Sequence, residues 1–336
     1  MTRDEIIAQL AVTDPAALFA RADQVRRENV GDAVHLRGLI EFSNVCGRDC
    51  LYCGLRRSNK AVERYRMGVE EILSSARQAA ELGYKSVVMQ SGESCQYSVA
   101  DMCRLVSRIK KDLDLAVTLS IGEKSREEYA ALKAAGADRF LLRFETSSPK
   151  LFGALKPDSS YEDRLRCLGW LRELGFQVGS GIMVGLPGQS LAMIADDILL
   201  MQKLELDMIG IGPFIPNPLT PLATAQGGTL DLTLRALAVI RIVTKNTHIP
   251  ATTAMGSIDP AGRQKALKCG ANVLMPNVTP TRYRAQYQLY PGKICLEDKP
   301  GDCFLCISGM LTSLGRTIAT DPGHSFKLKA KTDSPD

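Results

Sequence analysis

The sequence predicts an α/β fold, the eight-stranded parallel (βα)8 TIM barrel, on two observations. Short apolar, β-branched runs recur from residue 36 onward, and segments with helical periodicity separate them. About eight such strand–helix units occupy roughly 240 residues, which is the usual size of this barrel. A doubly wound open sheet, which also alternates strands with helices, is the alternative architecture.

The strand candidates are the apolar runs themselves. They lie at residues 36–42, 86–90, 116–121, 139–144, 177–184, 208–214, 249–254 and 272–275. Between them, residues 69–82 and 161–174 show clear helical periodicity. Several helical segments end in a glycine shortly before the next strand candidate, as at Gly83, Gly136, Gly175 and Gly270. Glycine accepts the left-handed conformation that closes a helix at little cost, so these positions support the alternation.

Three segments flank the barrel, which we place at residues 35–290. Residues 1–34 are predicted to be an N-terminal helical segment, with Asp14 placed to cap a helix that has Pro15 in its first turn. Residues 291–322 form a short C-terminal appendage that carries cysteines, and residues 323–336 form a flexible tail. No boundary divides the barrel itself.

The composition is that of an ordinary globular protein. The chain has 336 residues, of which 45% are hydrophobic and 24% charged, and its net charge is +5. This charge is too small to indicate binding to nucleic acid or to a membrane surface. No apolar run reaches the roughly 18 residues of a membrane span, and the N-terminus lacks the apolar core of a secretory signal. We therefore expect a cytoplasmic protein with reduced cysteines.

A short loop after the first strand candidate carries three clustered cysteines. Cys46, Cys50 and Cys53 follow a C-x3-C-x2-C pattern, so three thiolates can hold one metal centre from a single loop. Closed structural zinc sites use four protein ligands, and three ligands leave one coordination position open for chemistry. A zinc site would need a distant fourth ligand, for which His35 and Cys95 are the candidates.

This loop, with an aromatic residue before its last cysteine, resembles the cluster loop of the radical SAM superfamily. Blocks at residues 40–46, 51–57, 89–93, 209–216, 249–256 and 289–295 extend the resemblance to the HydE family of FeFe-hydrogenase maturases, over residues 34 to about 315. The resemblance implies a barrel of radical SAM type and a 4Fe–4S cluster on the three cysteines. It also implies S-adenosylmethionine bound to the fourth iron, whose reductive cleavage yields the 5′-deoxyadenosyl radical.

The same resemblance assigns residues to the cofactor. Ser91 and Gly92 with Glu93 would receive the methionyl ammonium, and the Arg164 guanidinium would pair with the carboxylate. The full set of cofactor-binding candidates is Tyr52, Ser91, Gly92, Glu93, Glu145, Arg164 and Met183. For Arg164 the alternative is an ordinary helix-surface residue beside Asp163.

Seven further residues fall where members of this family line the substrate cavity: Arg37, Gln90, Arg143, Thr252, Thr253, Tyr287 and Tyr290. Arg37 stands out without the family, because it interrupts an apolar strand run where a buried charge needs a partner. An anionic substrate would supply that partner; the alternative is an arginine at the strand edge that extends to water. HydE sequences tend to carry histidine where this chain has Phe144, so a polar role is lost there.

A second group, Cys295, Cys303 and Cys306, resembles the auxiliary site of a subset of HydE proteins. It would hold a 2Fe–2S or 4Fe–4S cluster in a surface loop. We expect this site to bind iron without taking part in catalysis.

The resemblance implies a radical SAM enzyme that acts in assembly of the diiron site of the hydrogenase H-cluster. Its substrate would be small and anionic, a cysteine-bound iron–carbonyl–cyanide precursor, with the maturases HydG and HydF and an electron donor as partners. A related enzyme such as methylornithine synthase, or a sulfur inserter like biotin synthase, is the alternative. An iron–sulfur carrier without enzymatic activity is a third hypothesis.

Overall fold

The strands of the structure, a computed structural model that describes residues 1–93 and 97–328, follow one another around a ring. Six parallel strands pair in chain order: β2 (Gly38–Ser43), β3 (Ser86–Ser91), β4 (Ala116–Ser120), β5 (Arg139–Leu141), β6 (Gln177–Val184) and β7 (Met208–Pro213). A second sheet places β1 (Ala33–Leu36) between β8 (Val273–Leu274) and β9 (Thr317–Ile318). All its pairs are parallel too.

Isolated parallel bridges connect the two sheets. Met208 pairs with His248, the nearby Pro250 pairs with Val273, and Asn277 pairs with Leu39. The order therefore runs from β7 through residues 248–250 to β8 and back to β2. This parallel α/β arrangement confirms the predicted TIM-barrel-like fold.

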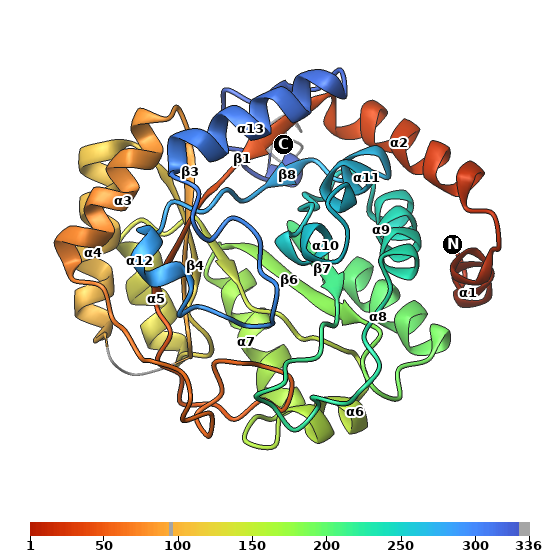
Figure 1. Ribbon diagram of the computed structural model, residues 1–336, viewed down its shortest axis with the longest axis horizontal. Helices are drawn as coiled ribbons and strands as arrows, with labels where there is room; N and C mark the ends of the chain where they lie inside the picture. Colours follow the sequence, from red (N-terminus) through yellow and green to blue (C-terminus); the bar gives the residue numbers. More distant parts are fainter. Residues whose placement is uncertain (94–96, 329–336) are drawn as a thin grey trace.

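Helices cover the outside of the strands (Figure 1). The longer ones are α3 (Val69–Glu81), α4 (Val99–Leu113), α5 (Arg126–Ala134), α7 (Tyr161–Glu173), α8 (Leu191–Lys203) and α9 (Leu230–Thr244). The shorter ones are α6 (Pro149–Leu155), α10 (Thr253–Ile258), α11 (Gly262–Lys268) and α12 (Thr281–Arg284). At the N-terminus, α1 (Arg3–Ala11) packs on α8 and α9, and α2 (Ala16–Val30) packs on α9. In the appendage, α13 (Pro300–Ser313) leads into β9.

Local sequence signals explain where these helices begin and end. Gly83 and Gly136 have φ angles of 83° and 104°, and Gly175 and Gly270 have φ angles of 78° and 116°. All four thus adopt the left-handed conformation expected of helix-closing glycines. Near the N-terminus, Asp14 accepts a hydrogen bond from the Ala16 amide at 3.0 Å, but the N-cap of α2 is Pro15, so Asp14 is not the predicted cap and Pro15 precedes the first helical residue.

One strand candidate did not form as expected. Residues 249–254 contribute only bridges, and α10 begins at Thr253. Pro250 has no backbone N–H to donate to a neighbouring strand, which limits the ladder at this position. The backbone of Ala251 still donates to Val273 at 2.9 Å, so the segment keeps its place in the ring.

The described part of the expected flexible tail, residues 323–328, instead packs across the N-terminal ends of the strands. Ser325 is buried, and its hydroxyl donates to Asp207 at 2.6 Å. The Ser325 amide donates to Gln177 at 2.7 Å. Composition alone suggested a loose segment here, whereas buried polar partners at the start of β6 and β7 fix it in place.

Candidate active site

A cavity of about 360 Å³ lies at the carboxyl ends of the strands. The loop that follows β2 brings Cys46, Cys50 and Cys53 to its wall. The Arg48 amide donates to the Cys46 sulfur at 3.4 Å, and burial raises the pKa of all three thiols. Within residues 1–93 and 97–328, no three His, Cys, Asp or Glu side chains are grouped to hold a single metal ion. A 4Fe–4S cluster differs from such a site, because each thiolate binds a different iron.

The cluster loop is held by hydrogen bonds from one arginine. Arg64 Nη1 donates to the carbonyls of Asn44 at 2.7 Å and Leu55 at 2.9 Å. Its Nη2 donates to the carbonyls of Arg56 at 2.7 Å and Asn59 at 3.1 Å. One planar guanidinium therefore joins both ends of the loop that carries the cysteines.

The histidine proposed as a fourth zinc ligand lies elsewhere. His35 is on β1, near the N-terminal ends of the strands, and its Nε2 lies 3.3 Å from the Asp321 carboxylate. Cys95, the other candidate, lies outside the described residues.

The structure gathers every predicted cofactor-binding residue around the cavity that the cysteines line: Tyr52, Ser91, Gly92, Glu93, Glu145, Arg164 and Met183. Gly92 is required by close packing, because a Cβ atom there would lie 2.3 Å from the Val45 carbonyl oxygen and 2.9 Å from Cys46 Cβ. The turn after β3 thus touches the cluster loop directly.

Two arginines and two glutamates form a partly buried charge network beside this turn. Arg48 Nη2 lies 2.8 Å from Glu93 and 2.7 Å from Glu123, while Arg164 Nε lies 2.8 Å from Glu123. Burial alone would raise the pKa of Glu93, but the charges of Arg164, Lys156 and Arg48 hold it below its usual value. Arg164 is only 3% exposed, so it is not the helix-surface residue of the alternative interpretation.

Several buried polar atoms here make no hydrogen bond among the described residues. They include Nε and Nη2 of Arg164 and Oε2 of Glu145. Glu145 also has a φ angle of 64°, a strained conformation for a side chain other than glycine. Arg164 and Glu145 are paired by charge with Glu123 and Arg143 but keep hydrogen-bonding capacity at these atoms. This capacity beside three thiols fits a ligand that carries both a carboxylate and polar hydroxyl or amino groups, as S-adenosylmethionine does.

Six of the seven substrate-site candidates line the same cavity: Gln90, Arg143, Thr252, Thr253, Tyr287 and Tyr290. Gln90 Nε2 donates to the Tyr287 hydroxyl at 3.2 Å, and Thr252 Oγ1 donates to the Ile211 carbonyl at 3.1 Å. Arg143 Nη2 lies 3.1 Å from Glu145, so the substrate and cofactor candidates are in contact.

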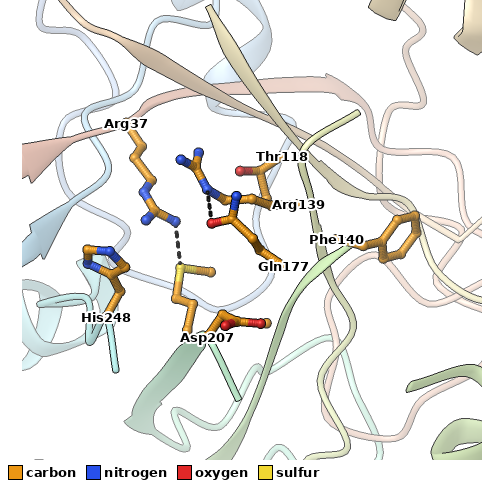
Figure 2. Close-up of a pocket in the computed structure, with 9 residues that line it drawn as sticks. Arg37, Thr118, Arg139, Phe140, Gln177, Asp207 and His248 are labelled. Atoms are coloured by element: carbon orange, nitrogen blue, oxygen red, sulfur yellow. Dashed lines mark hydrogen bonds between the residues drawn. The ribbon is translucent and has the colours of Figure 1, made fainter. Parts of the chain in front are cut away.

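Arg37 is the exception. Its guanidinium lies in a separate small pocket beside Arg139 and His248 (Figure 2). There it donates to the Met208 sulfur at 3.0 Å and to the Gly323 carbonyl at 3.1 Å. Burial and the charge of Arg139 lower its pKa. Arg37 is buried, as the sequence suggested, but it is neither at the strand edge nor in the wall of the main cavity.

A buried ion pair in the cavity wall was missed. Lys293 Nζ pairs with the carboxylate of Glu41, whose Oε2 also accepts from Asn277 Nδ2 at 2.8 Å. Glu41 is 1% exposed and Lys293 9%. The sequence does contain a sign of this ion pair, because Glu41 interrupts an apolar strand run in the same way as Arg37.

The second cysteine group is only partly assembled. Cys303 is a close neighbour of Cys295, and its thiol lowers the pKa of Cys295. Cys306 lies one turn further along α13 and is exposed. Thus two of the three cysteines lie on a helix, where the sequence suggested a surface loop.

Comparison with known proteins agrees with this geometry. Residues 40–201 match the model of the radical SAM superfamily. The chain is 52% identical over 325 residues to the [FeFe] hydrogenase maturase subunit HydE of Thermotoga maritima, covering 96% of this chain and 93% of that protein.

The chain belongs to the HydE family of radical SAM enzymes. Membership implies a 4Fe–4S cluster and S-adenosylmethionine as cofactors. The structure of methylornithine synthase superposes with a TM-score of 0.84 at 23% identity, covering 95% of this chain and 94% of that one. The maturase HydG of Carboxydothermus hydrogenoformans gives a TM-score of 0.80 at 20% identity, covering 94% and 75%. These two likenesses show the fold alone. No described helix is long and apolar enough to cross a membrane.

Proposed function

We propose that this HydE-family chain acts in assembly of the diiron site of the FeFe-hydrogenase H-cluster. Its identity to the Thermotoga maritima maturase over nearly the whole chain supports this function. One observation carries the proposal: three loop cysteines and the cofactor-type residues line a single cavity together with Gln90, Arg143 and Tyr287.

The residues around the cavity have separate tasks in this proposal. Cys46, Cys50 and Cys53 hold a 4Fe–4S cluster, and Arg164 orients the carboxylate of S-adenosylmethionine. When bound, these cofactors supply an electron and a source of the 5′-deoxyadenosyl radical. Gly92 allows the turn after β3 to approach the cluster loop, as its contact with Val45 requires.

The substrate in this proposal is a small anion, the cysteine-bound iron–carbonyl–cyanide precursor. Arg143 supports this choice, because its Nε is buried and makes no hydrogen bond among the described residues. Tyr287 and Gln90 add polar groups at the same wall. HydG would supply the precursor, HydF would take part downstream, and a low-potential protein would donate the electron.

The second cysteine group is proposed as an auxiliary iron–sulfur site without a catalytic role. The contact between Cys295 and Cys303 supports a shared ligand site, and exposed Cys306 could complete it from the next helical turn. Changing Cys303 and Cys306 to Ser should remove the extra iron and keep cofactor cleavage. Loss of cleavage in this variant would contradict the assignment.

The main test uses anaerobically reconstituted protein. Cys46→Ala, Cys50→Ala and Cys53→Ala should each abolish formation of 5′-deoxyadenosine. Cys103→Ala, which removes a thiol from α4 far along the chain from the cluster loop, is the matched control. Adding S-adenosylmethionine to the reduced wild-type protein should change its electron paramagnetic resonance signal. Activity retained in the three loop variants would refute the function.

A further inference from the structure

One lysine in the cavity has no acidic partner among the described residues. Lys156 follows α6, is 5% exposed, and lines the cavity together with Cys50 and Cys53. Its Nζ lies 5.5 Å from the ring centre of Phe152 and makes no ion pair within residues 1–93 and 97–328. A buried ammonium is costly unless negative charge lies nearby, so its position needs an explanation.

Hydrogen bonds on both sides of Lys156 fix its backbone to the cluster loop. The Leu51 amide donates to the Leu155 carbonyl at 2.9 Å. On the other side, Asp158 Oδ2 accepts from the Asp49 amide at 2.9 Å, and the Asp158 carbonyl accepts from an Arg48 guanidinium at 2.6 Å. The intervening Pro157 restricts the backbone further. Lys156 is therefore held against the loop that carries the cysteines.

The negative charge available to this ammonium is that of the cysteine site. Lys156 lines the same cavity as Cys50, Cys53 and Glu93. Glu93 is already shared by two arginines, since Arg48 lies 2.8 Å and Arg164 3.6 Å from its carboxylate oxygens. Cys50 and Cys53, as thiolates, are then the groups left for Lys156 to neutralise.

We propose that Lys156 is a positioning residue whose ammonium neutralises charge at the three-thiolate cluster site and so favours the cluster's one-electron reduction. The inference rests on the cluster site of the proposed function. Reduction adds one electron, taken from an external one-electron reductant of low potential, and breaks no bond. Because a positive charge nearby stabilises the added negative charge, Lys156 acts through the cluster without touching substrate.

The test is a redox titration of the reconstituted holoprotein, followed by electron paramagnetic resonance. Lys156→Met should retain wild-type iron content but lower the ratio of reduced to oxidised cluster about tenfold at a fixed potential, a shift of about 59 mV for a one-electron couple. Lys156→Arg, which keeps the charge, should titrate close to wild type. Lys150→Met removes an exposed lysine from α6, the helix that Lys156 follows, and should leave the titration unchanged.

The possible outcomes separate this inference from the proposed function. A loaded Lys156→Met protein with an unshifted titration would overturn the role of Lys156. If Lys156→Met loses iron, Lys156→Gln is titrated in its place: a negative shift supports the inference, an unshifted titration rejects it. If both neutral variants lose iron and Lys156→Arg keeps it, the cluster site needs the positive charge. If all three variants lose iron, the charge is not what the site needs, and the inference is rejected. A wild-type protein that binds no 4Fe–4S cluster would contradict the proposed function itself.

Discussion

The buried pair of Glu41 and Lys293 allows a quantitative test of the cavity wall. Lys293→Met removes the cation next to a carboxylate that is 1% exposed and leaves it only the hydrogen bonds of neighbours such as Asn277. Breaking a buried pair by removing one partner costs about 3–5 kcal/mol. For a large domain, each kcal/mol lowers the melting temperature by roughly 2–4 °C, so we expect a fall of about 10 °C.

The assay is thermal unfolding by circular dichroism, with a double-mutant cycle. Glu41→Gln combined with Lys293→Met should recover much of the lost stability, because no uncompensated buried charge remains. Lys265→Met is the matched control, since it breaks an ion pair with Asp259 in which the lysine is 51% exposed. It should leave the melting temperature nearly unchanged. A loss in Lys293→Met no larger than in this control, or strictly additive single variants, would refute the reasoning.

Three further predictions concern single positions. Gly92→Ala should prevent stable cluster loading, measured as iron content, because its Cβ would lie 2.3 Å from the Val45 carbonyl oxygen; full loading would contradict this. Arg64→Lys should lower iron content several-fold, because one ammonium cannot replace four hydrogen bonds to the loop; unchanged iron content would count against it. Burial raises the pKa of Asp197 from 3.8 to about 6, so its carboxylate is destabilising above pH 6 and this cost disappears as the pH falls towards 4. Asp197→Asn should therefore melt higher than wild type at pH 7 and lose that advantage near pH 4; an equal difference at both pH values would exclude this cause.

The sequence predicted the ring of strands and the cysteine loop well, because both depend on local pattern. Apolar runs mark buried parallel strands, and a glycine such as Gly136 marks the end of a helix whatever packs against it. The resemblance to a family then placed residues such as Glu145 and Arg164 at the carboxyl end of the barrel. Parallel strands all end on this side, so the residues that follow them lie close together. The cavity of the structure contains them all.

Other features depend on contacts between distant parts of the chain, which pattern does not encode. The sequence indicated that Arg37 is buried, but its direction is set by partners at Met208 and Gly323. In the sequence, Ser325 belongs to a polar segment that resembles a tail. Its hydrogen bond to Asp207 is visible only in the structure. Lys156 belongs to no sequence motif. Only its position against the cluster loop in the structure indicates a function.

The position of β1 has a consequence for how the chain folds. Its two neighbours are β8 and β9, which come from the last quarter of the sequence. During synthesis the N-terminal strand therefore leaves the ribosome long before either partner exists, and contacts of such long range form slowly. We expect the nascent protein to assemble the β2 to β7 side first, and to complete the ring only after the appendage has been made.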